Sequence, residues 1–351
     1  MNKPVSDYNS RSAIIWSNQI RFWRTLDEMS GFAPSESKKF VENYTRVFFQ
    51  EKGYKYVNPE GLVPSDHSSI LYTNSAVINL ISQIKNNSFA WKFFCIQRCL
   101  RTQNLTQQNS EIPEYMSLFT MPWIFVEIEE YNSFCGDIIE FLWTLIPLSR
   151  FKIAFSNDHE IHKLYRQDSA LENMDHPYEY YNRKFWSKTI TGEKDTFSDS
   201  LTWEWASIML NSGSQYEEIG NIIILKIDWK SSFACFWFWI ETMLSILNNR
   251  EIHQVYFSNI GNNLEKHFPD LKKPQTIRLI DLFQLLFELH GFWIVPENRW
   301  RGHIMTKILK KIQQLALELK LSQDQIEAIF LTQSDPDKLL QYFKNYNKKN
   351  D

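Results

Sequence analysis

The sequence predicts an α+β fold in which an antiparallel sheet flanked by helices is followed by an all-helical C-terminal domain. Runs of β-branched and aromatic residues, separated by polar loops, recur through residues 35–262. From residue 275 to residue 346 the apolar residues instead recur at helical spacing. The length of 351 residues and the hydrophobic share of 43% suit a globular chain with ample core. Residues 1–34 are predicted to form an irregular N-terminal extension.

The first elements follow from local signals. A helix is expected from Ser35, where a polar start precedes apolar residues at helical spacing, and Gly53 should end it. Residues 54–57 are expected to form a short strand. The segment 68–80 is predicted to be a strand that continues into a helix.

A long hairpin is predicted next, because two apolar segments, 90–101 and 115–131, are joined by a polar loop. The rest of the domain is expected to contain a helix at 135–148, a strand at 150–156, a helix at 157–167, a strand at 219–229 bounded by Gly220, and a strand continuing into a helix at 233–247. Four helices are predicted to follow, at 276–291, 301–320, 322–331 and 335–346.

Charge and cysteine usage limit the function classes. With a net charge of −3, any contact with nucleic acid requires a local basic patch. No apolar run is long enough to span a bilayer, and the polar start is unlike a signal peptide, so a cytoplasmic protein without DNA or membrane partners is expected. No metal site is predicted, because the cysteines form no C-x-x-C pair and have no histidine cluster beside them: Cys95, Cys99, Cys135 and Cys235.

Two arginines interrupt the apolar stretch "FCIQRCLR" in the first strand of the predicted hairpin. Arginine is almost never buried without a partner, so the stretch is expected to hold an anion or a carboxylate. Arg98 and Arg101 are three residues apart, which places them on opposite faces of a strand. Arg98 is predicted to form a structural ion pair.

Six segments in chain order then carry a resemblance. They are "FFQEKGYKYVNPEGLVPSDHSSILYTNSAV", "IQRCLR", "RFKIAFSNDHEIHKLYR", "KFWSKTITG", "EIGNIIILKI" and "VPENRWRGHIMTKILKKI". Together they resemble the N-terminal half of alanyl-tRNA synthetase, a class II aminoacyl-tRNA synthetase, over residues 40 to 315. The resemblance implies a class II synthetase core and a tRNA-recognition part, and no segment resembles the family's editing domain.

The resemblance implies an activation site that uses ATP with Mg²⁺. Arg101 matches the arginine that grips the α-phosphate of ATP, and such a rigid cation offsets the charge of the reacting groups. Phe119 and Glu241 complete the implied nucleotide contacts. The implied amino-acid pocket consists of Trp186, Asn221, Ile223 and Cys235.

Several positions depart from the family's pattern. The arginine that sandwiches adenine has become Thr242, and the aspartate that holds the substrate amine has become Cys235. Trp237 and Trp239 replace two glycines, and two indoles should fill space that small residues leave for ATP. Together with the loss of paired histidines, these changes argue against ordinary alanine activation.

The helical end departs less from the family. Asn298, Arg301 and Gly302 are retained in the segment that the family uses against the tRNA acceptor stem. The next helix should carry a basic face, because four polar residues follow at helical spacing: His303, Lys307, Lys310 and Gln314. The predicted tRNA contacts are Asn298, Arg299, Arg301, His303, Lys307, Lys310 and Lys311, and such phosphate contacts are salt-dependent.

Three functions remain open from the sequence. The first is a repurposed synthetase-like protein that binds a tRNA acceptor or aminoacyl-tRNA with an altered or lost activation site. The second is an active ATP-dependent ligase for a non-standard amino or carboxylic acid. The third is an inert synthetase-like subunit that forms a homodimer or joins a partner protein, with the helix at 35–52 and "CFWFWIE" as its contact surface.

Overall fold

We describe the protein from a computed structural model. It describes residues 34–59, 61–64, 71–76, 92–102, 105, 116–146, 150–156, 179–181, 187–189, 202–213, 215–227, 231–249, 252, 255, 273–331 and 336–347. The predicted N-terminal extension, apart from residue 34, and the predicted helix at 157–167 lie outside these ranges. So does most of the segment 68–80, of which residues 71–76 contain no strand.

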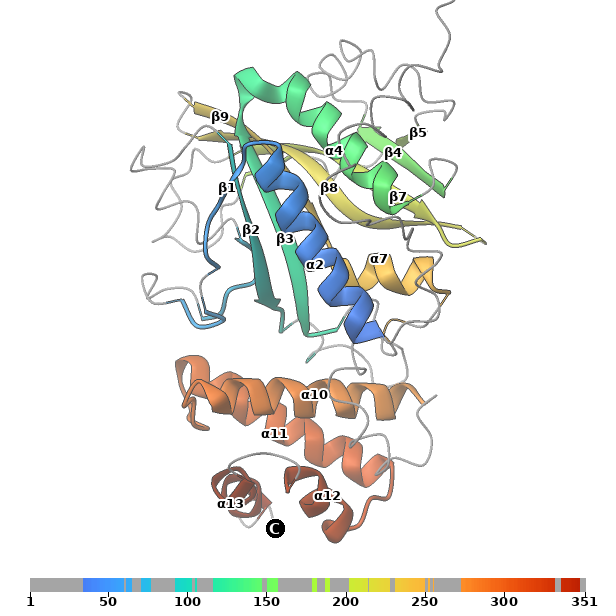
Figure 1. Ribbon diagram of the computed structural model, residues 1–351. Coiled ribbons are helices and arrows are strands. Elements are labelled where there is room, and N and C mark those ends of the chain that lie inside the picture. The colour runs from blue at the N-terminus through green and yellow to red at the C-terminus, as the bar shows by residue number, and fades with distance from the viewer. Residues whose placement is uncertain are drawn as a thin grey trace, which may run out of the picture.

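A mixed sheet forms the centre of the upper part of the molecule (Figure 1). Within the described ranges it contains nine strands: β1 (Lys55–Tyr56), β2 (Lys92–Leu100), β3 (Leu118–Glu127), β4 (Phe151–Ser156), β5 (Glu179–Tyr181), β6 (Ser187–Thr189), β7 (Thr202–Asn211), β8 (Tyr216–Ile227) and β9 (Ser231–Phe238). Their order is β1-β2-β3-β9-β8-β7-β4-β5, with β6 also pairing with β7. All pairs are antiparallel except β1–β2 and β4–β5, so the predicted antiparallel sheet has parallel edges.

The helices are α2 (Pro34–Glu51), α4 (Tyr131–Leu145), α7 (Ile240–Leu247), α10 (Pro274–Gly291), α11 (Trp300–Glu318), α12 (Gln323–Phe330) and α13 (Pro336–Asn347), with the 3₁₀ turn η3 (Ile128–Glu130) before α4. The predicted α+β class is confirmed, including the helical C-terminal region. Gly53 ends α2 as expected, because its φ of 84° is in the left-handed region that glycine adopts without strain.

The predicted hairpin is the pair β2–β3, whose register aligns Cys95 with Trp123 and Cys99 with Phe119. One face of the sheet packs against α2 and α4, which lie in front of it in Figure 1, through the buried side chains of Phe94, Ile124 and Phe236. Since side chains alternate along a strand, the other face carries odd-numbered residues such as Cys95, Phe119, Ile223 and Cys235. That face carries the strand residues of the predicted nucleotide and amino-acid sites, which are Phe119, Asn221, Ile223 and Cys235. Glu241, in contrast, belongs to α7.

Gly220 lies inside β8 rather than at its boundary, which differs from the prediction. A Cβ atom there would approach the Trp237 carbonyl oxygen of β9 to 2.2 Å. Glycine is therefore required by the close approach of two strands and does not mark a turn at this position.

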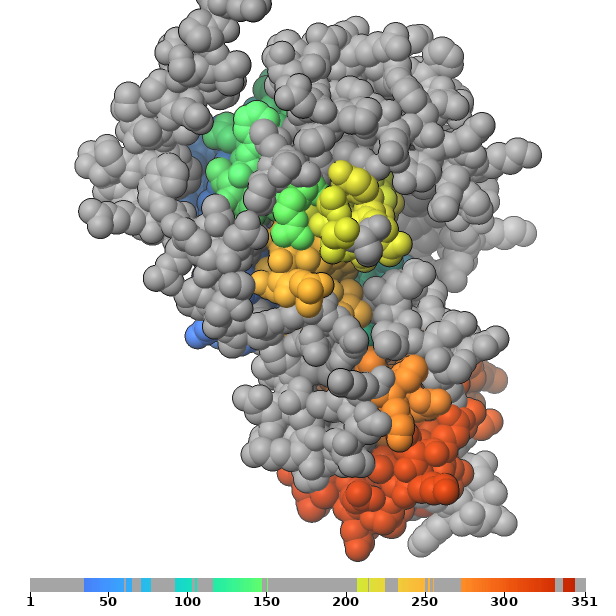
Figure 2. Space-filling model, turned by 90° about the vertical axis from the view of Figure 1, so that its right-hand side faces the viewer, coloured from blue at the N-terminus to red at the C-terminus, as the bar shows by residue number. Residues whose placement is uncertain are grey.

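The C-terminal helices form the lower part of the molecule, shown in orange to red in Figure 2, below α7. Their apolar side chains share one buried cluster with the hairpin, including Leu100, Phe283 and Ile308. Gly302 allows the start of α11 to lie against the preceding turn, because a Cβ there would come within 2.6 Å of the Val295 carbonyl oxygen. In the described part of the chain, no helix is both long enough and apolar enough to cross a membrane.

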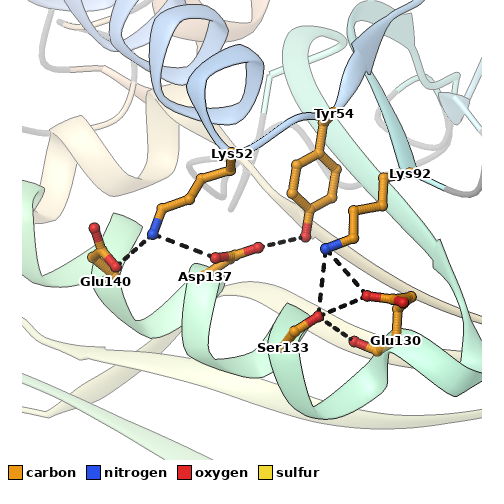
Figure 3. A network of polar contacts seen from close by, with 7 residues as sticks. All are labelled: Lys52, Tyr54, Lys92, Glu130, Ser133, Asp137 and Glu140. Carbon is orange, nitrogen blue, oxygen red and sulfur yellow. Dashed lines mark hydrogen bonds and ion pairs between the residues drawn. The ribbon is translucent and has the colours of Figure 1, made fainter.

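A polar network joins the outer surface of α4 to the hairpin and to the end of α2 (Figure 3). Lys52 lies between two carboxylates, 2.7 Å from Glu140 and 3.5 Å from Asp137. Tyr54, which is 2% exposed, donates its hydroxyl hydrogen to Asp137 at 3.0 Å. Burial raises the pKa of Asp137 above its ordinary value of 3.8, against the opposing effects of Tyr54 and Lys52.

We predict that Asp137→Asn removes a pH dependence of stability. The folded protein holds the Asp137 proton to a higher pH than the unfolded chain does. The free energy of unfolding therefore falls as the pH rises from 3.8 through the raised pKa. The asparagine keeps an oxygen for the Tyr54 hydroxyl, so denaturant titrations from acid to neutral pH should show a smaller loss of stability in the variant.

The control is Glu140→Gln, which removes another contact of Lys52 and leaves Tyr54 and Asp137 in place. This control should keep the wild-type pH dependence. Equal pH dependence in Asp137→Asn and the wild type would refute the assignment of the network.

Candidate functional site

Arg101 directly follows β2, at the end of the hairpin that faces the C-terminal helices. Its guanidinium carbon lies 5.0 Å from the centre of the Phe119 ring and 5.7 Å from that of Trp239. Its backbone N–H donates to the Ser117 carbonyl oxygen at 2.8 Å. The predicted phosphate-binding cation therefore lies against two aromatic rings, which stabilise its guanidinium by cation–π contact.

The two tryptophans that replace glycines continue an aromatic row across the sheet. Trp239 packs edge-to-face on Trp237, with ring centres 4.8 Å apart, and Trp237 stacks on Trp123 at 6.1 Å. The row then continues through Phe125 to Phe93. Of the two indoles that are predicted to fill space left for ATP, Trp239 is the one that contacts the Arg101 guanidinium.

Glu241, at the start of α7 directly after β9, contacts both β3 and α2. Its carboxylate, 1% exposed, accepts the Thr120 backbone N–H with both oxygens, at 2.9 and 3.1 Å. The Lys38 ammonium of α2 lies 2.7 Å from the same group. Two groups of the protein itself, the Thr120 N–H and the Lys38 ammonium, thus engage the Glu241 carboxylate. We therefore propose a structural role for Glu241 in place of the predicted nucleotide contact.

The described part of the predicted amino-acid pocket is apolar. Cys235 and Ile223 are directly opposed in the β8–β9 register and are 0% and 7% exposed. Burial raises the pKa of the Cys235 thiol well above its ordinary value, so the group is neutral at physiological pH. A neutral thiol cannot pair with an ammonium group, which agrees with the argument against alanine activation.

Asn221 belongs to a small polar group at the start of β8. Its amide nitrogen donates to Glu218 at 3.0 Å, and the Ser207 hydroxyl donates to the other Glu218 oxygen at 2.7 Å. Asn221 itself is 3% exposed. Trp186, the fourth predicted pocket residue, lies outside the described residues.

These groups do not fit an ATP–Mg²⁺ complex. Glu241 is engaged by Thr120 and Lys38 and is not presented to a triphosphate, while the half-buried Arg101 guanidinium lies against two aromatic rings. Thr242 has no planar cationic group that could stack on adenine. Among the residues that the structure describes, no group of three or more His, Cys, Asp and Glu side chains could hold a metal ion.

The predicted basic face of α11 is arranged as the spacing indicates. Four cationic or titratable side chains, Arg299, His303, Lys307 and Lys310, are exposed, as is Gln314 one turn further on. Asn298, just before the helix, is exposed as well. The arrangement offers hydrogen-bond donors and positive charge along one side of a rigid helix, which suits the phosphates of a nucleic acid.

Arg301 and Lys311 do not belong to this exposed face. Arg301 donates from Nε to the Leu71 carbonyl oxygen at 2.7 Å and from Nη2 to that of Pro64 at 3.2 Å. Lys311 lines a small cavity between α10 and α11 with Arg278. Burial, and next the charge of Arg278, lower the pKa of Lys311. We therefore reassign Arg301 as a positioning residue and Lys311 as part of the helix–helix contact.

A chain of hydrogen bonds connects α11 to the end of β2. The Tyr72 hydroxyl donates to the Arg301 carbonyl oxygen at 2.9 Å. The Leu100 N–H donates to the Thr73 carbonyl oxygen at 2.8 Å. On the other side of the hairpin, Arg98 pairs with Glu288 of α10 at 2.7 Å, which confirms the predicted structural ion pair. The basic face and the surroundings of Arg101 are therefore held on one framework.

Sequence reasoning missed Lys38 and Glu218. Lys38 was assigned only to the start of a helix, and nothing in its local sequence indicates a buried carboxylate 203 positions away. Glu218 is the first residue of "EIGNIIILKI", a segment similar to the family's motif. That position in the motif was the signal that could have identified it.

The sequence is similar to those of alanine–tRNA ligases. It is 23% identical over 310 residues to the enzyme of Buchnera aphidicola and 21% identical over 332 residues to the mitochondrial enzyme of Dictyostelium discoideum. These matches cover 75% and 82% of this chain, and the chain spans 34% of the length of each relative. They confirm the predicted resemblance and an alanyl-tRNA synthetase-like class II fold. No protein-family model matches the chain.

Solved structures of two aminoacyl-tRNA synthetases are similar to part of this chain. The chain matches S. aureus histidyl-tRNA synthetase with a TM-score of 0.42 and 11% identity, covering 67% of this chain and 80% of that one. It matches Entamoeba histolytica asparaginyl-tRNA synthetase in complex with asparaginyl-adenylate with a TM-score of 0.39 and 13% identity, covering 73% and 71% of the two chains.

We predict that Lys38→Met destabilises the protein more than Glu241→Gln. Removing the ammonium leaves a buried carboxylate without its cation, which costs about 3–5 kcal/mol. The glutamine keeps an oxygen for the Thr120 N–H and buries no charge, so it should cost about 1–2 kcal/mol. Chemical denaturation measures both losses.

The matched control is Lys39→Met, at the next residue of α2, which is exposed. It should change stability by less than about 0.5 kcal/mol. If Lys38→Met is no less stable than Lys39→Met, the buried ion pair does not have the structural role described here.

Proposed function

We propose that this protein binds the acceptor end of a tRNA and does not activate alanine. The observation that carries the proposal is the exposed row of Arg299, His303, Lys307 and Lys310 on one side of α11. The chain as a whole has a net charge of −3, so this row is a local departure from the average charge of the protein. Local basic rows of this kind are the electrostatic footprint of nucleic-acid binding.

The rigidity of α11 supports the proposal. Its first turn is fixed by the Arg301 guanidinium and the Tyr72 hydroxyl, and its buried face packs on α10 through residues such as Ile308 and Ile312. An RNA helix is recognised largely by its shape and its phosphates. A straight row of donors on a fixed helix is well suited to that mode of recognition.

The similarity to alanine–tRNA ligases also supports tRNA as the nucleic acid. The retained residues Asn298, Arg301 and Gly302 lie at the start of α11, where the resemblance implies acceptor-stem recognition. In this proposal Asn298 contacts the RNA, while Arg301 and Gly302 fix the position of the helix. The chain spans only 34% of its relatives' length, so their full activity is not assigned to it.

The absence of alanine activation rests on the surroundings of Arg101. Its guanidinium faces Phe119 and Trp239, and a neutral thiol stands where the family has its amine-binding carboxylate. Activation needs a cation aimed at the α-phosphate and a group that holds the substrate amine. The second need is not met at Cys235, so we infer that synthetase-like chemistry is altered or lost.

We predict that Lys307→Ala and Lys310→Ala weaken tRNA binding and its dependence on salt. Each lost phosphate contact should reduce the slope of log affinity against log salt by about 1, and the double variant should lose both. Filter binding of purified tRNA at rising salt measures affinity and slope together.

The matched control is Lys55→Ala, which removes an exposed lysine of β1 and should leave both quantities unchanged. The proposal fails if the wild type binds tRNA no better than an unstructured RNA of equal length. It also fails if the double variant keeps the wild-type affinity and slope.

A further inference from the structure

Exposed aromatic side chains gather in the turn between α10 and α11. Among the described residues, the large apolar side chains that are exposed are Trp143, Phe292, Trp293, Val295, Trp300, Leu317 and Leu331. Four of these seven lie between residues 292 and 300. Trp293 is 75% exposed and Trp300 is 61% exposed. A cluster of exposed aromatic side chains on a soluble fold marks a binding surface.

The turn that presents these rings is ordered by its own hydrogen bonds. The Trp293 N–H donates to the His290 carbonyl oxygen at 2.8 Å, and the Glu297 N–H donates to that of Gly302 at 3.1 Å. Trp293 and Trp300 have φ values of 60° and 52°, which a bulky residue adopts only at a cost in free energy. The two indoles are therefore held outward by a fixed backbone.

A cation contacts the Trp293 ring, and basic residues flank Trp300 in the sequence. The Lys338 ammonium of α13 lies 5.3 Å from the centre of the Trp293 ring. Arg299 precedes Trp300, and His303 follows it at a spacing of three residues, which places the two side chains on one side of α11. Aromatic rings beside cations are the combination that binds unpaired nucleotides, through base stacking and phosphate contacts.

We propose that Trp293 and Trp300 form a stacking platform for the unpaired bases at the 3′ end of the RNA that α11 binds. The inference rests on the proposed function, because α11 supplies the phosphate contacts. It adds the single-stranded end as the part of the RNA that the turn recognises. Every base has a π-face, so the platform is tolerant of sequence and selects for bases that are not paired.

The test compares two RNA hairpins, one with an unpaired 3′ extension and the same hairpin with a blunt end. The wild type should bind the extended hairpin more tightly. Trp300→Asn removes the ring and suits the left-handed backbone, so the fold should be kept. This variant and Trp293→Ala should each lose about 5- to 100-fold in affinity for the extended hairpin and change little toward the blunt one.

Trp143→Ala is the matched control, since Trp143 is a 38% exposed tryptophan on α4 and lies outside the turn. It should bind both hairpins as the wild type does. Trp300→Phe keeps an aromatic ring and should retain the preference. Addition of the extended hairpin should quench the tryptophan fluorescence of the wild type, and the quench should shrink in Trp300→Phe but not in Trp143→Phe.

Equal binding of both hairpins by the wild type, with no loss in the Trp293 and Trp300 variants, overturns the stacking platform and leaves the proposed function standing. Binding of neither hairpin by the wild type overturns both. Loss of affinity for the two hairpins alike in the Trp300 variant also overturns the platform, because stacking affects only the unpaired end.

Discussion

The buried carboxylate of Glu241 is the constraint on which the rest of the structure depends. Strand β3 pairs with β9 only as far as Trp123, because β9 ends at Phe238 and the chain turns into α7. The Thr120 N–H would then lack a partner, and Glu241 supplies one, while Lys38 of α2 balances its charge. One side chain thus joins the hairpin, the first helix and the turn that leads to α7.

This turn also determines what surrounds Arg101. Trp237 and Trp239 lie where β9 ends, and Arg101 lies against Trp239 and Phe119. The end of β2 is also connected through Thr73 and Tyr72 to the start of α11. The aromatic surroundings of Arg101 and the exposed basic helix are therefore held on one framework, and the proposed function uses the basic helix.

Much of the fold follows from periodicity. The hairpin, the long strand β8 and the four C-terminal helices were predicted because hydrophobic spacing is local information. The opposite faces of Arg98 and Arg101 were predicted for the same reason. The roles of Glu241, Arg301 and Lys311 were not, since their partners Lys38, Leu71 and Arg278 are distant in sequence. A charged residue in a motif shows which chemistry is available, and only the fold shows which group uses it.

The measurement that tests the account most directly is pyrophosphate exchange into ATP, with alanine and with a panel of other amino and carboxylic acids. The account predicts no exchange above a protein-free control with any acid, because Glu241 is engaged within the protein and Thr242 has no cationic group to stack on adenine. Exchange that depends on one acid and is lost in Arg101→Ala would contradict it, and would instead make this chain an adenylate-forming ligase.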